Sequence, residues 1–175
     1  MKAILKAVFI FLVAGVPVFS AGVQPVSAEI KYAFVDVARI FDDYEKTKTN
    51  DQQLQDLGRQ KEEQRENMVQ EIRQLKDELT LLAEDAKEEK QDAVNKKVQA
   101  LQDFERDTRR ELGQQRDRVV KEIFKDIDDT VQRYGERKGV DLIFNERALV
   151  YRNDKLDITE EILGDLNKEY ASKKN

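Results

Sequence analysis

Paired acidic side chains are the residues in this sequence whose types and spacing could do chemistry. Neighbouring carboxylates can act as general acid and base, or can bind calcium. These pairs lie in stretches expected to be helical, where adjacent side chains point to different faces, and no glycine turn of a calcium loop accompanies them. We therefore interpret them as solvated surface and predict neither a catalytic nor a metal site. The pairs are Asp42-Asp43, Glu88-Glu89 and Asp128-Asp129.

The amino-acid composition argues against most other catalytic mechanisms. The chain of 175 residues has no histidine and no cysteine, so the usual metal ligands, the usual nucleophile partner and the easiest general base are missing. A formal net charge of −5 argues against a nucleic-acid partner. We predict a protein that is not an enzyme and has no cofactor. Without disulfides, its stability must come from packing or assembly.

The N-terminus has the layout of a secretory signal peptide. Lys2 and Lys6 precede an apolar run at residues 7–19, which is too short to span a bilayer as a stable helix. Small residues follow, ending at Ala28. We predict a signal peptide at residues 1–28, cleavage after Ala28, and a mature chain outside the cytoplasm with no stable membrane insertion. An uncleaved N-terminal anchor is the alternative.

A long helical hairpin is predicted for the middle of the chain. Residues 38–134 contain no proline and many Glu, Lys, Gln, Arg and Leu residues. Their apolar residues recur at alternating steps of four and three, which is typical of a coiled-coil seam. A single straight helix would be about 145 Å long, so we expect an antiparallel hairpin with its tip near residues 84–92. The predicted seam residues are Met68, Ile72, Leu75, Leu79, Leu82, Val94, Val98 and Leu101.

Two glycines and three apolar residues within this hairpin are candidate functional positions. Gly58 and Gly113 are nearly equidistant from the expected tip, so they should lie at the same height along the arm. Each weakens a helix by roughly 1 kcal/mol relative to alanine, and we hypothesise a hinge there. Two tolerated glycines that coincide by chance are the alternative. Val69, Leu81 and Phe104 lie off the main stripe and are candidate contacts for a bound chain, while the seam is expected to pack helix against helix.

Strand-forming residues are confined to the two ends of the sequence. Residues 30–37 are apolar, aromatic and β-branched and predict a buried strand, with Asp36 placed to cap the following helix. Residues 140–145 and 148–151 predict two more strands joined by a tight turn. The two ends must therefore meet in one small sheet, from which the hairpin projects.

Helix boundaries near the C-terminal end have their own signals. Gly135 and Gly139 are expected to close the long helix. Thr159 is the expected N-cap of a final helix, and Ile162 and Leu166 should form its buried face.

The predicted fold is α+β and mostly α, with a body formed by residues 29–41 and 135–175 and an arm formed by residues 42–134. Three short strands and one short helix make a thin core without disulfides, so we expect the body to self-associate. The residues expected to form this oligomerisation body are Tyr32, Phe34, Val35, Val37, Ile40, Phe41, Leu142, Phe144 and Val150.

This order of elements resembles the Skp/OmpH family of periplasmic chaperones. The resemblance rests on residues 34–41 before the hairpin and on residues 142–144, 149–151 and 156–162 after it. It implies a homotrimer in which three sheet regions form a barrel-like body and three flexible hairpins hang from it. It also implies that unfolded outer-membrane proteins are held in the cavity between the hairpins without ATP.

The predicted function is therefore that of an ATP-independent periplasmic holdase, which prevents aggregation of outer-membrane protein precursors. Scattered apolar contacts on a strongly charged surface suit weak binding of many unrelated chains. A structural or adaptor coiled coil of the cell envelope is the alternative. The best-known members of the family are strongly basic, whereas this chain is acidic, so a lipopolysaccharide-binding patch is not implied for it.

Overall fold

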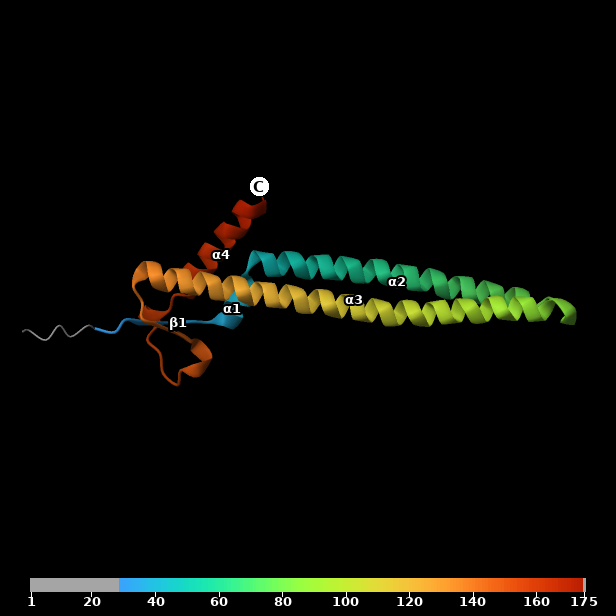
Figure 1. Cartoon of the computed structure of the whole chain (residues 1–175), viewed down its shortest axis with the longest axis horizontal. Helices are drawn as coiled ribbons and strands as arrows, with labels where there is room; N and C mark the ends of the chain where they lie inside the picture. Colours follow the sequence, from blue (N-terminus) through green and yellow to red (C-terminus); the bar gives the residue numbers. More distant parts are fainter. Residues whose placement is uncertain (1–28, 175) are drawn as a thin grey trace, which may run out of the picture.

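A long two-helix arm projects from a small body made by both ends of the chain (Figure 1). The computed structural model describes residues 29–174, and the side chains of all of these except 84–86. The predicted signal peptide therefore lies outside the described residues. The elements are β1 (Tyr32–Val35), α1 (Val37–Asp43), α2 (Glu45–Thr80), α3 (Glu84–Lys138), β2 (Leu142–Asn145), the short 3₁₀ turns η1 (Glu146–Ala148) and η2 (Asp154–Leu156), and α4 (Thr159–Lys174).

The arm is the predicted antiparallel hairpin. α2 and α3 lie side by side along the whole length of α2 (Figure 1). None of the helices in the described part of the chain is long and apolar enough to cross a membrane. Ion pairs join α2 to α3 at successive heights, and those that face solvent contribute at most about 1 kcal/mol each, whereas Lys46–Asp126 at the base is partly buried. They include Lys46–Asp126 at 2.8 Å, Lys61–Glu111 at 2.8 Å, Arg65–Glu105 at 2.9 Å and Glu71–Lys97 at 2.6 Å.

The turn at the tip of the arm comes earlier than predicted. α2 ends at Thr80 and α3 begins at Glu84, so the connection is residues 81–83. The predicted tip at residues 84–92 is instead the start of α3. Its charged and polar residues are good helix formers, so the high polarity marked an exposed first turn of a helix and not a loop.

Tyr44 divides a stretch that the sequence predicted as one helix. Its extended backbone (φ −65°, ψ 126°) separates α1 from α2. Asp36 caps α1 as predicted, since its carboxylate accepts the Arg39 N–H at 3.0 Å. Tyr44 gives α2 no side-chain cap. Asn167 of α4 accepts the Glu45 N–H at 3.0 Å instead, so the C-terminal helix satisfies a free donor at the start of the arm.

The sheet has two parallel strands, β1 and β2, and not the three that the sequence predicted. Tyr32 lies opposite Leu142, and Phe34 opposite Phe144. The strand predicted at residues 148–151 is wrong in this protomer, where the chain after β2 turns into η1. The Asn145 side chain accepts the N–H of Arg147 at 3.1 Å, and this local bond favours a turn over a continued strand.

The other edge of β1 is occupied by the chain that precedes α4. Asp157 forms an isolated bridge beside Phe34, and the Ile158 N–H donates to the Phe34 carbonyl at 3.0 Å. The prediction that Thr159 is the N-cap of α4 is wrong. The Asp157 carboxylate caps the start of the helix instead, by accepting the Thr159 N–H at 2.9 Å. The Thr159 hydroxyl instead accepts the Asp36 N–H at 2.9 Å. It thereby ties α4 to the end of β1.

The core lies where the base of the arm meets the sheet and α4. Ile40, Ile123 and Ile162 are completely buried there, and Leu166 is 1% exposed. Burial of each such side chain contributes roughly 1.5–3 kcal/mol. The same cluster joins α1, α3 and α4 to β1, so the two ends of the chain share one core.

Two glycines near the end of α3 have different roles. Gly139 follows the last helical residue with a left-handed backbone (φ 64°, ψ 42°), and it closes the helix as predicted. Gly135 lies inside α3, so its predicted role in closing the helix is wrong. A Cβ on Gly135 would lie 3.5 Å from Cδ1 of Ile143, an ordinary van der Waals contact, so this position lies against β2 but does not require glycine.

Thr47 at the base of the arm has a buried hydroxyl with no hydrogen-bond partner among the described residues. Its side chain is 3% exposed, and an unsatisfied buried hydroxyl costs about 1–3 kcal/mol. We predict that Thr47→Val, which keeps the shape, raises the free energy of unfolding by about 1 kcal/mol in urea denaturation. Thr130 is the matched control, because it is equally buried but its hydroxyl accepts a hydrogen bond from Arg133. A Thr130→Val variant should be less stable, and a destabilised Thr47→Val variant would contradict the prediction.

Candidate functional site

One face of the sheet is partly exposed in the protomer, although Phe34 on this face is 2% exposed and has the Arg152 guanidinium 5.7 Å from the centre of its ring. Tyr32, Leu142 and Phe144 are 56%, 50% and 42% exposed, and their positions in the register place them on the same side of the sheet. Val150 and Tyr151 in the following loop are also exposed. Isolated apolar residues on a surface are ordinary, but a group of them marks an interaction site. We call these five residues the body patch.

The residues predicted to form the oligomerisation body divide into two groups. Val35 and Ile40 lie within the protomer's own core, with Val37 and Phe41 half-buried at its edge. Phe34 is also buried, but on the other face of the sheet, beside Phe144. On the surface, as part of the body patch, lie Tyr32, Leu142, Phe144 and Val150. Alternation along a strand predicts two faces, but which face the same chain covers depends on tertiary packing.

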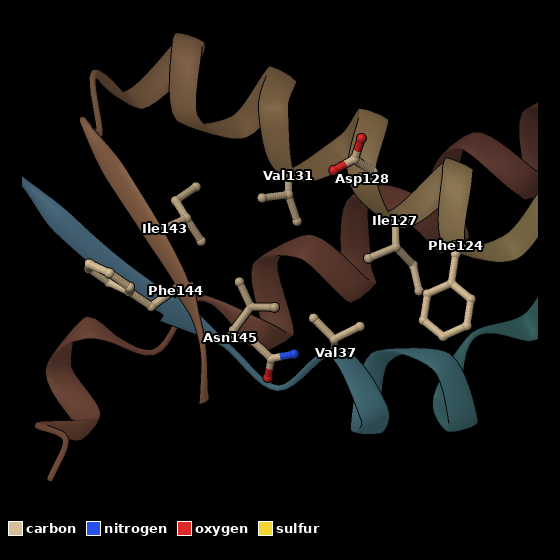
Figure 2. A pocket seen from close by; sticks show the side chains of 9 residues that line it. Val37, Phe124, Ile127, Asp128, Val131, Ile143, Phe144 and Asn145 are labelled. Carbon is tan, nitrogen blue, oxygen red and sulfur yellow. The ribbon is translucent and has the colours of Figure 1, made fainter. Parts of the chain in front are cut away.

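A pocket of about 330 Å³ opens between β2 and the base of the arm. Figure 2 shows Ile143 on β2 pointing toward Val131 on α3, with Val37 of α1 below them, while Phe144 points to the other side of the sheet. Most of the residues that line this pocket are apolar. It can therefore receive apolar side chains of another chain.

Phe124 lines this pocket, and it was not predicted from the sequence as a functional residue. It is 48% exposed, and its ring stacks on Phe41 with centroids 5.3 Å apart. An aromatic residue off the seam positions of a highly charged helix is the signal that could have identified it. Phe124 connects the pocket to the start of the arm.

A polar cluster fixes the base of the arm. The Tyr44 hydroxyl donates to Asp126 at 3.4 Å, and Lys46 donates to the same carboxylate at 2.8 Å. Burial first, and then the charge of Asp126, raise the pKa of Tyr44 well above its ordinary value, so its hydroxyl stays protonated and remains a donor. The edge of the Tyr170 ring contacts Tyr44, with centroids 5.9 Å apart.

The predicted seam residues are buried to different depths. Ile72 and Val94 are 7% and 2% exposed, and the other six are half-buried. Among the described residues, α2 has no buried side chain between Thr47 and Ile72, and α3 has none between Val94 and Ile123. The middle of the arm is therefore held mainly by ion pairs and half-buried contacts.

The candidate contacts for a bound chain are spread along the arm and do not form one site. Leu81 is 86% exposed at the tip. Val69 is half-buried beside the seam, and Phe104 is half-buried near the middle of α3. The structure therefore provides several small apolar positions on a charged surface.

An open groove of about 320 Å³ lies between α2 and α3 in the middle of the arm. Gly58 lines it from α2, and Phe104 and Leu112 line it from α3. Gly113 on α3 lies at nearly the same height along the arm as Gly58 on α2. The Lys61–Glu111 ion pair shows this, because Lys61 is one helical turn from Gly58 and Glu111 is two residues from Gly113. A Cβ on either glycine would meet no atom within 4 Å.

The fold and these surfaces define a class of protein, namely a mostly helical α+β protein with a long two-helix arm and exposed apolar residues on its body. Among the described residues, no group of His, Cys, Asp and Glu side chains could hold a metal ion. The functional surfaces are shallow and face solvent, which suits binding of chains more than chemistry on a small molecule.

The chain belongs to the family of OmpH-like outer membrane proteins, whose family model matches residues 31–166. This confirms the resemblance to Skp/OmpH chaperones, which are periplasmic and non-enzymatic. A crystal structure described as an OmpH-like outer membrane chaperone from Caulobacter crescentus CB15 has a TM-score of 0.73 with 16% identity, covering 81% of this chain and 86% of that one. At this identity the match shows a shared fold. No curated protein gave a significant sequence match.

Proposed function

We propose that the protein is an ATP-independent holdase of the periplasm, which binds unfolded outer-membrane protein precursors and prevents their aggregation. The observation that carries this proposal is the arm itself, a long charged hairpin with small, separated apolar positions. Such a surface binds unrelated unfolded chains weakly and stays soluble while it does so. Membership of the OmpH-like family supports the same class of client.

The active form in this proposal is a homotrimer assembled through the body. The body patch and the apolar pocket beside β2 support self-association, because they leave several large side chains in water in a single protomer. Three bodies in contact would place three arms around one cavity that receives the client. Export with cleavage after Ala28 would deliver the mature chain to the periplasm.

The arm has two separate roles in this proposal. Its seam residues pack α2 on α3, while Val69, Leu81 and Phe104 contact the client. The hinge at Gly58 and Gly113 lets the arm adjust to clients of different size. The absence of buried side chains from the described middle of the arm supports a soft point at this height.

We predict that the mature protein suppresses aggregation of a urea-denatured outer-membrane β-barrel protein diluted into buffer. At a modest molar excess, light scattering should fall strongly, and it should fall equally with and without ATP. Albumin at equal mass is the control for unspecific crowding. Unchanged scattering would favour the adaptor function, in which the arm bridges folded components of the envelope.

A further inference from the structure

The groove in the middle of the arm is lined mainly by charged and polar side chains, with Phe104 and Leu112 as its apolar part and the Lys61 ammonium 5.9 Å from the centre of the Phe104 ring. Gly58 contributes no side chain to it, and Phe104 and Leu112 line the opposite side. Nothing lies within 4 Å of the position that a Cβ of Gly58 would occupy. A volume of about 320 Å³ lies at the lower end of the range for ligand pockets, so it suits one or two side chains and not a folded partner.

Three basic side chains line this groove, and they differ in whether they form ion pairs with carboxylates of the same chain. Arg65 pairs with Glu62 at 2.8 Å and with Glu105 at 2.9 Å. Lys61 pairs with Glu111 across the arm. Arg109 also lines the groove, is exposed, and has no ion pair with any carboxylate in residues 29–174 for which side chains are described. An anionic group at this rim could therefore pair with Arg109, although the chain as a whole is acidic.

We propose that this groove is a docking site for an unfolded client segment that carries a large apolar side chain next to a carboxylate. The apolar side chain lies over Gly58 against Phe104 and Leu112, and the carboxylate pairs with Arg109. This inference rests on the holdase function proposed above and names the part of the client that the arm selects. It also gives Gly58 a role that Gly113 does not share, because Gly113 does not line the groove.

The test uses short peptides with the alternating apolar and polar residues of a membrane β-strand, each with one tryptophan followed by aspartate or by lysine. The protein contains no tryptophan, so the fluorescence of the peptide reports binding directly. Gly58→Leu fills the space beside Gly58 and should weaken binding of the Trp-Asp peptide about five- to tenfold, the effect of losing about half of the burial of one apolar side chain in an open groove. Gly113→Leu is the matched control, since it makes the same change in an equally open helical position. It should leave the affinity unchanged.

A second pair of variants tests the charge. Arg109→Gln should remove the preference for the Trp-Asp peptide over the Trp-Lys peptide, and Arg109→Lys should retain it. An exposed charge pair contributes little, so the preference should be about three- to fivefold and should shrink at high salt. Arg118→Gln, an exposed arginine of α3 outside the groove, is the control.

The outcomes separate this inference from the holdase proposal and from the hinge. If both glycine variants weaken binding equally, the hinge explains the effect and the docking site is refuted. If neither weakens it while aggregation is still suppressed, the holdase stands and the docking site is refuted. If the protein neither binds the peptides nor suppresses aggregation, both proposals fail together. Loss of binding in Gly58→Leu alone, with the charge preference lost only in Arg109→Gln, supports the docking site.

Discussion

Replacing Phe144 with aspartate is expected to convert the proposed trimer into monomers at micromolar concentration. Phe144 lies on β2 and is 42% exposed in the protomer, within the body patch beside Tyr32 and Leu142. A carboxylate forced into an apolar interface without a partner costs at least about 3 kcal/mol. A symmetric trimer would contain three of them, so dissociation is expected to be complete.

The mass of the mature protein in solution, from light scattering after size-exclusion chromatography, measures this effect. Leu81→Asp is the matched control, because Leu81 is apolar and 86% exposed but lies at the tip of the arm. It should remain trimeric. A monomeric wild-type protein, or a Phe144→Asp variant that stays trimeric, would show that the body patch is not the assembly surface.

Monomeric Phe144→Asp also tests the mechanism of the holdase. If the client is held between three arms, the variant should lose most of its suppression of aggregation although its helix content is unchanged. If it suppresses aggregation as well as the trimer does, single arms are sufficient and no cavity is needed. Far-ultraviolet circular dichroism provides the check on folding.

Replacing Ile162 with alanine is expected to lower the free energy of unfolding by about 2–5 kcal/mol. Ile162 on α4 is completely buried in the cluster that joins β1, α1, α3 and α4. Removing its side chain leaves a cavity in the single core shared by both ends of the chain. Since small domains have total stabilities of only about 5–15 kcal/mol, this change removes a large share.

Urea denaturation at fixed protein concentration measures this loss, because assembly makes the stability depend on concentration. Leu79→Ala is the control on the arm, where the side chain is only half-buried, and it should cost about 1 kcal/mol. Equal losses at the two positions would mean that the arm, and not the body, holds most of the stability. The prediction would then be wrong.

Much of the architecture could be predicted from the sequence because the signals are local. Steps of four and three between apolar residues, without proline, specify a helical seam whatever the rest of the chain does. A carboxylate at Asp36 before a helix caps it by accepting the N–H of Arg39 in the first turn. The strands at residues 30–37 and 140–145 were identified by their apolar and β-branched residues, and both are present as β1 and β2.

The wrong predictions concern segments whose secondary structure is decided by contacts with residues far away in the sequence. Tyr44 ends α1 in a region that contains no proline or glycine, and Asn167, 122 positions later in the chain, accepts the free Glu45 N–H at the start of the next helix. Residues 148–151 have strand propensity, but the protomer offers them no partner strand among the described residues. Gly135 looks like a helix terminator in the sequence, but α3 continues through it to Lys138, with Ile143 of β2 lying against it.

The sequence by itself determined the hairpin, the body built from both chain ends, and the resemblance to a chaperone family, because periodicity, composition and element order are properties of the chain alone. Only the tertiary structure decided which apolar residues are core and which form the body patch, since burial depends on what the other end of the chain covers. It also decided that Gly58 opens into a groove with Phe104 and Leu112, because α2 and α3 must be aligned before residues so far apart can share a surface.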